Sequence, residues 1–183
     1  MRLTRSECLL LAGLGLLLTA AGSSWYHLAP NDPGLAIDRL TMAVAFAGLL
    51  GLAAAMHVSA RAGRGLSLAL LLLAPAAVVQ WYVSGNVLSW AVVQAGGMLM
   101  LLLCLFVPAR EGLRVRWLLV LAAYALAKLF EGADHAVFHA GGGLLSGHTL
   151  KHLAAALAAW PVISALAALR HGQNAPKAAA QAA

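Results

Sequence analysis

The residues best suited to catalysis or metal binding gather in two short polar segments that interrupt long apolar runs. The segments read GSSWYHLAPNDPGLAIDR over residues 22–39 and SGHTLKHL over residues 146–153. Together they supply five side chains able to bind a metal or handle a proton: Ser23, His27, Asp38, His148 and His152. Because hydrolytic metal sites use imidazoles, a carboxylate and a hydroxyl, we expect the two segments to meet in one site.

The histidines predict a zinc site. His148 and His152 are spaced i, i+4, so they share one helix face, which is the spacing used when two imidazoles bind one zinc ion from a helix. His27 could add a third nitrogen. Three histidines with an open fourth position describe a catalytic zinc with water in the open place. Such a zinc ion lowers the pKa of its water towards about 7 and polarises a carbonyl group.

Asp38 and Ser23 complete the predicted site. Asp38 falls in the first turns of a predicted helix, where the helix dipole favours a carboxylate, and it is the natural general base. Ser23 precedes His27 by four residues and lies one turn deeper on the same face, where its hydroxyl could donate to an oxyanion. Ser24 is the neighbouring alternative, but it points about 100° away on an ideal helix.

Each residue also has a purely structural interpretation. A single histidine in a membrane helix can simply form a hydrogen bond at the interface, and a histidine pair can bind haem or link two helices. Ser23 could be a small packing residue, and Asp38 could pair with Arg39 at the lipid headgroups. Ionisable residues within membrane helices are functional candidates by default, so the hypothesis depends on the five residues as a set.

A second polar group follows along the chain, over residues 128–139. Its members are Lys128, Glu131, Asp134, His135 and His139. Lys128 and Glu131 are spaced i, i+3 and could neutralise each other, while Glu131 could instead orient His135 as a ligand. The i, i+4 spacing of His135 and His139 makes them rival zinc ligands. The role of this group is left open.

The composition predicts an integral membrane protein. The chain has 183 residues, of which 62% are hydrophobic and 10% charged, against about 25% charged in a soluble domain. The net charge is +6, yet the basic residues form no patch with aromatic residues, so no nucleic-acid partner is expected. Cys8 and Cys104 lie within apolar runs and are expected to be free thiols.

Six apolar runs have about the 20 residues that a helix needs to cross a bilayer. They predict an all-α polytopic bundle whose six transmembrane helices cover residues 7–28, 34–58, 65–84, 87–107, 114–138 and 147–169. We expect one domain over residues 1–170 and a disordered tail over residues 171–183. The first run also resembles a signal peptide, but cleavage near Gly22 would remove one of an evenly spaced set.

Prolines mark particular points of these runs. Pro33 after Asp32 fits an N-cap followed by proline at the first helical position. Pro75 and Pro161 fall inside predicted helices, where neighbouring groups can satisfy the freed carbonyl.

The charges between the runs predict the orientation. With six helices, nine basic residues fall on one side: Arg2, Arg5, Arg61, Arg64, Arg110, Arg114, Arg116, Arg170 and Lys177. The positive-inside rule then places both termini in the cytoplasm and the active site towards the outer side. An aromatic belt at the outer interface is predicted from Trp25, Tyr26, Trp81, Tyr82 and Trp90.

GSSWYHLAPNDPGLAIDRL followed by SGHTLKHLAAA resembles the alkaline ceramidase family, within the CREST group of membrane hydrolases that includes the adiponectin receptors. The group has a Ser and a His on one helix, an Asp at the start of the next and an H-x-x-x-H pair on the last. The matching residues here are Ser23, His27, Asp38, His148 and His152. The resemblance implies zinc held by the three histidines, with Asp38 as base and Ser23 stabilising the oxyanion.

The stretch AKLFEGADHAVF resembles the bacterial branch of this family, which implies a bacterial inner membrane. The chain differs from the ceramidase family in three respects. The eukaryotic ceramidases have a seventh helix before the Ser/His helix, whereas six are predicted here. Their acidic, calcium-binding N-terminal segment has no counterpart, so no calcium site is predicted. Thr41 stands where the family commonly has proline.

The predicted function is a zinc-dependent membrane amidohydrolase that cleaves the amide of a ceramide-like lipid to a fatty acid and an amine base. Two other functions are kept open: a non-catalytic receptor or scaffold with a structural zinc, and a haem-binding electron-transfer bundle. The exact lipid, the oligomeric state and the route of lipid entry are also left open.

Overall fold

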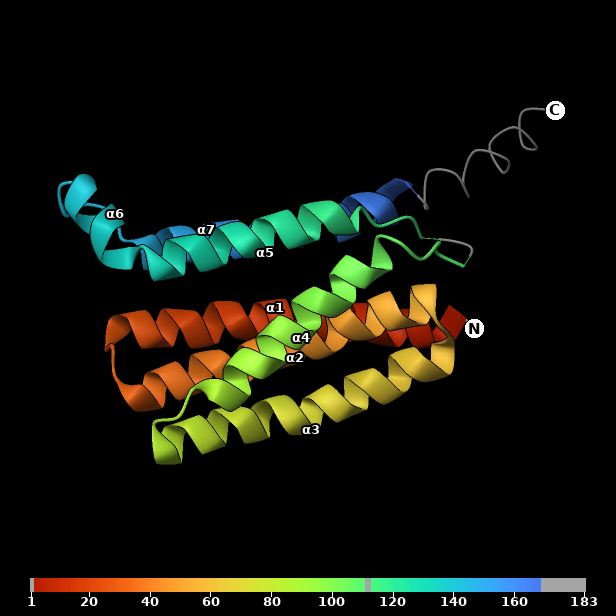
Figure 1. Cartoon of the computed structure of the whole chain (residues 1–183), viewed down its shortest axis with the longest axis horizontal. Coiled ribbons are helices and arrows are strands. Elements are labelled where there is room, and N and C mark those ends of the chain that lie inside the picture. Colours follow the sequence, from red (N-terminus) through yellow and green to blue (C-terminus); the bar gives the residue numbers. More distant parts are fainter. Residues whose placement is uncertain (1, 111–112, 169–183) are drawn as a thin grey trace. The chain divides into compact units, whose positions relative to one another are not determined.

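The structure, a computed structural model, describes residues 2–110 and 113–168, and these ranges contain helices but no strand (Figure 1). The all-α class is therefore confirmed for the described residues. The labelled helices are α1 (Arg2–Leu28), α2 (Asp32–His57), α3 (Ala60–Ser84), α4 (Leu88–Cys104), α5 (Trp117–Gly132), α6 (Asp134–Ala140) and α7 (Gly147–Leu157). The predicted tail lies outside the described residues.

The chain forms two compact units, which are described separately. Unit 1 is Met1–Arg110 and contains α1 to α4, and unit 2 is Glu111–Ala183 and contains α5 to α7. The single domain expected over residues 1–170 stays a prediction.

Several helices are long and apolar enough to cross a membrane. Among the described residues, the segments that qualify by length and composition are Arg5–Leu28, Asp32–His57, Ala60–Ser84 and Gly147–Ala168. Helix α4 is apolar but has 17 residues, and α5 has 16. The helices fit a membrane protein, while the predicted number of six spans is not confirmed.

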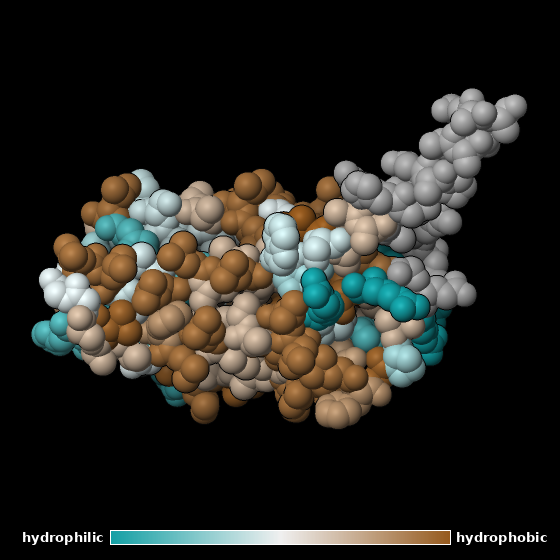
Figure 2. All heavy atoms as spheres, turned by 90° about the horizontal axis from the view of Figure 1, so that it is seen from above, coloured by the Kyte–Doolittle hydropathy of each residue, from teal (hydrophilic) through white to brown (hydrophobic). Residues whose placement is uncertain are grey.

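The surface agrees with this composition. Most of the face drawn in Figure 2 is hydrophobic, and hydrophilic side chains gather in smaller patches. Leu17, Leu72 and Leu129 are 73%, 74% and 68% exposed. Soluble monomers rarely expose contiguous apolar patches of this extent, so we expect lipid to cover this surface.

In unit 1, α1 and α2 run side by side in opposite directions (Figure 1). A Cβ atom added to Gly15 would lie 2.2 Å from the backbone nitrogen of Ala45, and one added to Gly48 would lie 2.2 Å from that of Ala12. Each helix therefore places a glycine against an alanine of the other. Small residues permit such close approach, which is how helices gain packing energy in lipid.

A compact core joins α2 to α3 and α4. It consists of Ala43, Ala74, Val78 and Trp90. Trp90 is only 3% exposed and its ring centroid lies 6.0 Å from that of Phe46. The prediction that Trp90 belongs to the aromatic belt is therefore wrong, because the small side chains of α2 and α3 leave room for its indole inside the unit.

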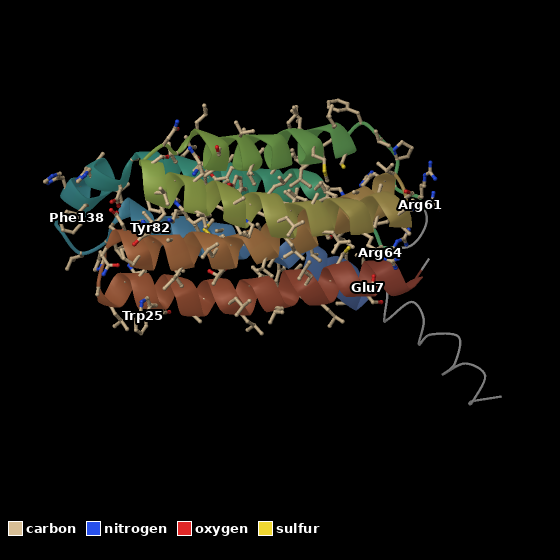
Figure 3. The ribbon with its side chains drawn as sticks, turned by 90° about the horizontal axis from the view of Figure 1, so that it is seen from below. Glu7, Trp25, Arg61, Arg64, Tyr82 and Phe138 are labelled. Atoms are coloured by element: carbon tan, nitrogen blue, oxygen red, sulfur yellow. The ribbon has the colours of Figure 1, made fainter. Side chains whose placement is uncertain are left out.

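The two ends of unit 1 differ in character. Figure 3 shows Glu7, Arg61 and Arg64 at one end and Trp25 and Tyr82 at the opposite end. Arg64 and Glu7 form an ion pair of 3.5 Å. Basic residues and interfacial aromatic residues are thus separated along the helices, as the predicted topology requires.

In unit 2, the helix predicted over residues 114–138 is divided into α5 and α6. Ala133, with φ −97° and ψ 15°, breaks it directly after Gly132. Glycine has a low helix propensity, and Gly147 packs into the bend. A Cβ atom added there would lie 2.3 Å from the carbonyl oxygen of Phe130 and 2.7 Å from the Cα atom of Asp134. The docking of α7 accounts for the break.

The helix predicted over residues 147–169 is also interrupted. Helix α7 ends at Leu157, residues 158–159 form a turn, and residues 160–168 are helical again. Pro161 has no N–H, and its ring clashes with the carbonyl of the residue four positions earlier, which is Leu157. Pro75, by contrast, lies inside the continuous helix α3, as predicted.

Candidate metal centre

The first part of the candidate site lies where the end of α1 packs against the start of α2. A Cβ atom added to Gly22 would lie 2.7 Å from Oγ1 of Thr41, and one added to Gly34 would lie 3.4 Å from the Cα atom of Tyr26. Along these contacts the residue numbers rise on α1 as they fall on α2. The polar ends of the two helices are therefore in direct contact and in an antiparallel register.

This register determines the relative levels of the site residues in unit 1. Asp38 lies level with Gly22 and Ser23, and His27 lies one turn further along, or about 6 Å. Asp38 is 1% exposed and Ser23 is 7% exposed, whereas Ser24 and His27 are exposed. The burial of Ser23 beside an exposed Ser24 favours Ser23 as the hydroxyl of the site.

Hydrogen bonds hold the segment of α2 that carries Asp38. Asn31, with φ −155°, caps the helix by accepting from the backbone nitrogen of Gly34 at 2.7 Å. The cap therefore lies one residue before the predicted Asp32, which is already helical, and Pro33 follows it in the first turn, where no intrahelical N–H is needed. Thr41 Oγ1 donates to the carbonyl oxygen of Asp38 at 2.7 Å.

The second part of the candidate site is the histidine pair of α7. The Nε2 atoms of His148 and His152 lie 3.0 Å apart, with ring centroids 4.8 Å apart. Two nitrogens bound at about 2.0–2.1 Å to one tetrahedral zinc ion are about 3.3 Å apart. The pair therefore has nearly the geometry of two zinc ligands, and the same distance also allows one ring to donate a hydrogen bond to the other.

This geometry bears on the haem alternative. Two axial ligands of one haem lie on opposite faces of the porphyrin. His148 and His152 leave no room for a porphyrin between nitrogens that are 3.0 Å apart. The pair could not ligate both faces of a single haem.

The pair lies beside the stripe that packs α7 onto α5. That stripe is Gly147, Lys151 and Ala154, which are buried at i, i+4 and i+7. His148 follows Gly147 and points about 100° away from it on an ideal helix. The two imidazoles therefore lie off this stripe and are half-buried.

Within the polar group of residues 128–139, Lys128 and Glu131 take part in ion pairs. Glu131 lies between two lysines: it is paired with Lys128, as predicted, and its Oε1 atom lies 3.7 Å from Nζ of Lys151. Lys151 is 7% exposed, so this pairing partly neutralises a buried charge. His135 and His139 lie on α6 and are exposed. Their role as rival ligands stays a prediction.

Other candidate residues have structural positions. His57 is 7% exposed, and its Nδ1 atom lies 2.7 Å from the carbonyl oxygen of Val107, at the end of unit 1 opposite to His27. Cys8 and Cys104 are buried free thiols, as expected. His171 lies outside the described residues.

Sequence reasoning missed several residues that shape the site. Asn31 caps α2, Gly22 admits Thr41, and Gly147 seats α7 against the bend after α5. A signal existed for Asn31, because asparagine before Asp-Pro is a common helix start. The two glycines gave no such signal, since their importance depends on which helix lies opposite.

Comparison with known proteins adds no relative. No protein-family model matches the chain, and neither a curated protein nor a solved structure matches it. The interpretation of the site therefore depends on the chemistry of the chain's own residues.

Proposed function

We propose that the chain is a zinc-dependent membrane hydrolase that cleaves the amide bond of a ceramide-like lipid to a fatty acid and an amine base. The observation that carries this proposal is the convergence of the His148 and His152 Nε2 atoms to 3.0 Å on one helix face. The burial of Asp38 and Ser23 at one level of the α1–α2 pair supports it.

The ligands in this proposal are His27, His148 and His152. Zinc held by three histidines supplies a positive charge that polarises the amide carbonyl and acidifies a water molecule. Imidazole nitrogens suit zinc well. Apolar surroundings strengthen the electrostatic effect of the zinc charge on the carbonyl and the water. The resemblance to the alkaline ceramidases points to the same ligand set.

Asp38 and Ser23 perform the proton transfer and the charge stabilisation. The Asp38 carboxylate accepts a proton from the attacking water as the new carbon–oxygen bond forms. The Ser23 hydroxyl donates a hydrogen bond to the carbonyl oxygen as negative charge develops on it. Asp38 then delivers its proton to the amide nitrogen as the carbon–nitrogen bond breaks, which releases the fatty acid and the amine.

The proposed topology has six membrane spans. Helices α4 and α5, with 17 and 16 residues, are about 25 Å long against a hydrocarbon core of about 30 Å, and local thinning of the bilayer accommodates such a difference. In this proposal the end of unit 1 that carries Arg61 and Arg64 (Figure 3) faces the cytoplasm with both termini. The site then faces the outer side of a bacterial inner membrane.

The main alternative is a membrane receptor or scaffold in which the three histidines hold a structural zinc. It shares the ligands with the hydrolase and differs in the role of Asp38. The burial of this carboxylate at the same level as a buried hydroxyl favours the hydrolase, because a structural site needs neither group. A haem-binding bundle is disfavoured by the geometry of the histidine pair.

The proposal is tested by metal analysis of the purified protein and of His27→Ala, His148→Ala and His152→Ala. We expect near-stoichiometric zinc in the wild type and a large loss in each variant. His135→Ala and His139→Ala are the matched controls and should retain zinc. Stoichiometric zinc in all three ligand variants would contradict the site, and a loss confined to the controls would assign it to α6.

A further inference from the structure

Asp134 connects the start of α7 to the bend between α5 and α6. Its Oδ1 atom accepts a hydrogen bond from the backbone nitrogen of His148 at 2.7 Å, across 14 residues of chain. His148 is the second residue of α7, and helix amides at this position have no partner within the helix. A carboxylate from another helix therefore satisfies the amide of a proposed zinc ligand.

Two further amides of the first turn, those of Thr149 and Leu150, are satisfied locally. Ser146, the N-cap, accepts from the backbone nitrogen of Thr149 through its Oγ atom at 3.1 Å. The backbone nitrogen of Leu150 donates to the carbonyl oxygen of Ser146 at 3.2 Å. Asp134 thus completes a run of three consecutive bonded amides, and His148 is the residue whose amide the local cap does not reach.

The same place is held by a close backbone contact. Gly147 lies against Phe130 and Asp134, and a Cβ atom there would come within 2.7 Å of the Cα atom of Asp134. The backbone of α7 can approach so closely because residue 147 has no side chain. The hydrogen bond and this contact together fix both the position and the rotation of the first turn of α7.

We propose that Asp134 is a positioning residue for the metal centre: it holds the first turn of α7 so that His148 and His152 converge on one point. This inference depends on the proposed zinc site. Groups that orient metal ligands typically change metal affinity by about 10–100-fold when they are removed. The carboxylate also lies at the positive end of the helix dipole, which strengthens the bond.

The decisive comparison is between Asp134→Ala and Asp134→Asn. Asparagine retains an oxygen that can accept from the His148 amide and caps helices about as well as aspartate. We expect Asp134→Ala to weaken Co²⁺ binding by about tenfold and to broaden the Co²⁺ absorption bands. Asp134→Asn should bind within about threefold of the wild type, with the wild-type spectrum.

Glu7→Ala is the matched control, because it also removes a carboxylate that accepts a hydrogen bond from another helix, but in unit 1. It should bind Co²⁺ as the wild type does. A loss in Glu7→Ala as large as that in Asp134→Ala would assign the effect to general destabilisation and overturn the inference. Wild-type affinity and spectrum in Asp134→Ala would overturn it as well.

Hydrogen exchange at the His148 amide separates this inference from the proposed function, because it needs no metal. We expect faster exchange in Asp134→Ala and wild-type exchange in Asp134→Asn. Unchanged exchange in Asp134→Ala would overturn the positioning role even if zinc binding is real. A wild type that binds no Co²⁺ through the histidines would overturn the proposed function, while the exchange rates still decide whether Asp134 holds α7.

Discussion

Asp38 is the residue whose burial most needs an explanation. It is 1% exposed, in the first turns of a mostly apolar helix. Removing a carboxylate from water costs several kcal/mol unless nearby groups offset it, and replacement by an apolar residue would avoid the cost. A general base in a water-excluding site is a function that justifies such a position.

Asp38→Asn should therefore abolish turnover without removing zinc. Asparagine is nearly isosteric but cannot accept the proton of the attacking water, so we expect the rate of lipid amide hydrolysis to fall by about a thousandfold. The measurement is hydrolysis of a ceramide-like substrate in detergent micelles, with zinc determined on the same sample. Unchanged hydrolysis in Asp38→Asn would remove Asp38 as the general base. A wild type that holds zinc but hydrolyses no lipid amide would instead support a non-catalytic receptor or scaffold.

Ser23→Ala tests the oxyanion role. Removing one donor of this kind typically costs about a hundredfold or more in turnover. We expect that loss in kcat with a nearly unchanged KM, because the hydrogen bond strengthens as charge develops. Ser24→Ala is the control, since Ser24 is exposed one residue away. Equal effects of the two substitutions would remove Ser23 from the mechanism.

At the scale of the helices, glycine contacts set how closely α1 and α2 approach. Gly48→Ala would force a Cβ atom to within 2.2 Å of the Ala12 backbone, so the helices must separate. We expect a loss of about 2 kcal/mol in the free energy of unfolding, measured by denaturation in detergent.

Gly13→Ala is the matched control for that substitution, because nothing lies within 4 Å of its added Cβ atom. It should be neutral or stabilise the helix by up to about 1 kcal/mol, since alanine is the better helix former. If both substitutions had the same effect, the close approach of α1 and α2 would not contribute to stability.

Most helices could be predicted from the sequence because apolar runs of 20 or more residues are a strong signal. Helices α1 and α2 agree with the runs 7–28 and 34–58 to within a few residues, apart from the earlier start of α1. The runs 114–138 and 147–169 were predicted as continuous helices, and both are interrupted. Hydropathy is insensitive to these interruptions, because the residues within them are as apolar as their neighbours.

The two interruptions differ in how predictable they were. The one before Pro161 follows from the missing N–H and the clash with Leu157, although Pro75 shows that a proline need not end a helix. The one at Ala133 depends on the docking of Gly147 into the bend. That contact joins residues that are not neighbours in the sequence, so no local sequence pattern predicts it.

For the candidate site, spacing alone predicted that His148 and His152 share a face, and the structure agrees. Ser23 near the end of one predicted helix and Asp38 near the start of the next were expected at one level, because consecutive spanning helices run antiparallel. Spacing could not predict the bond between Asp134 and His148, because the two residues are 14 positions apart and lie on different helices. Which helix a carboxylate caps is decided by packing.

At the scale of the whole molecule, the proposed topology can be tested by labelling single cysteines in a variant that carries Cys8→Ala and Cys104→Ala. Asn86→Cys and Leu144→Cys fall in predicted outer loops, and Arg61→Cys falls on the basic side. We expect a membrane-impermeant maleimide to label the first two in intact cells and the third only after lysis. Labelling of Arg61→Cys in intact cells would place residue 61 on the outer side and contradict the proposed topology.

The close fit of α1 and α2 has a consequence for the order in which the protein is made. Only residues 29–31 separate the two helices, and a lone α2 would carry Asp38 into lipid at a high energetic cost. The two helices are therefore best inserted together, as a hairpin, while the remainder of the chain is still being synthesised. Asp38 and Ser23 are then in place before the histidines of α7 are synthesised, and loading of the proposed zinc would be the last step of maturation.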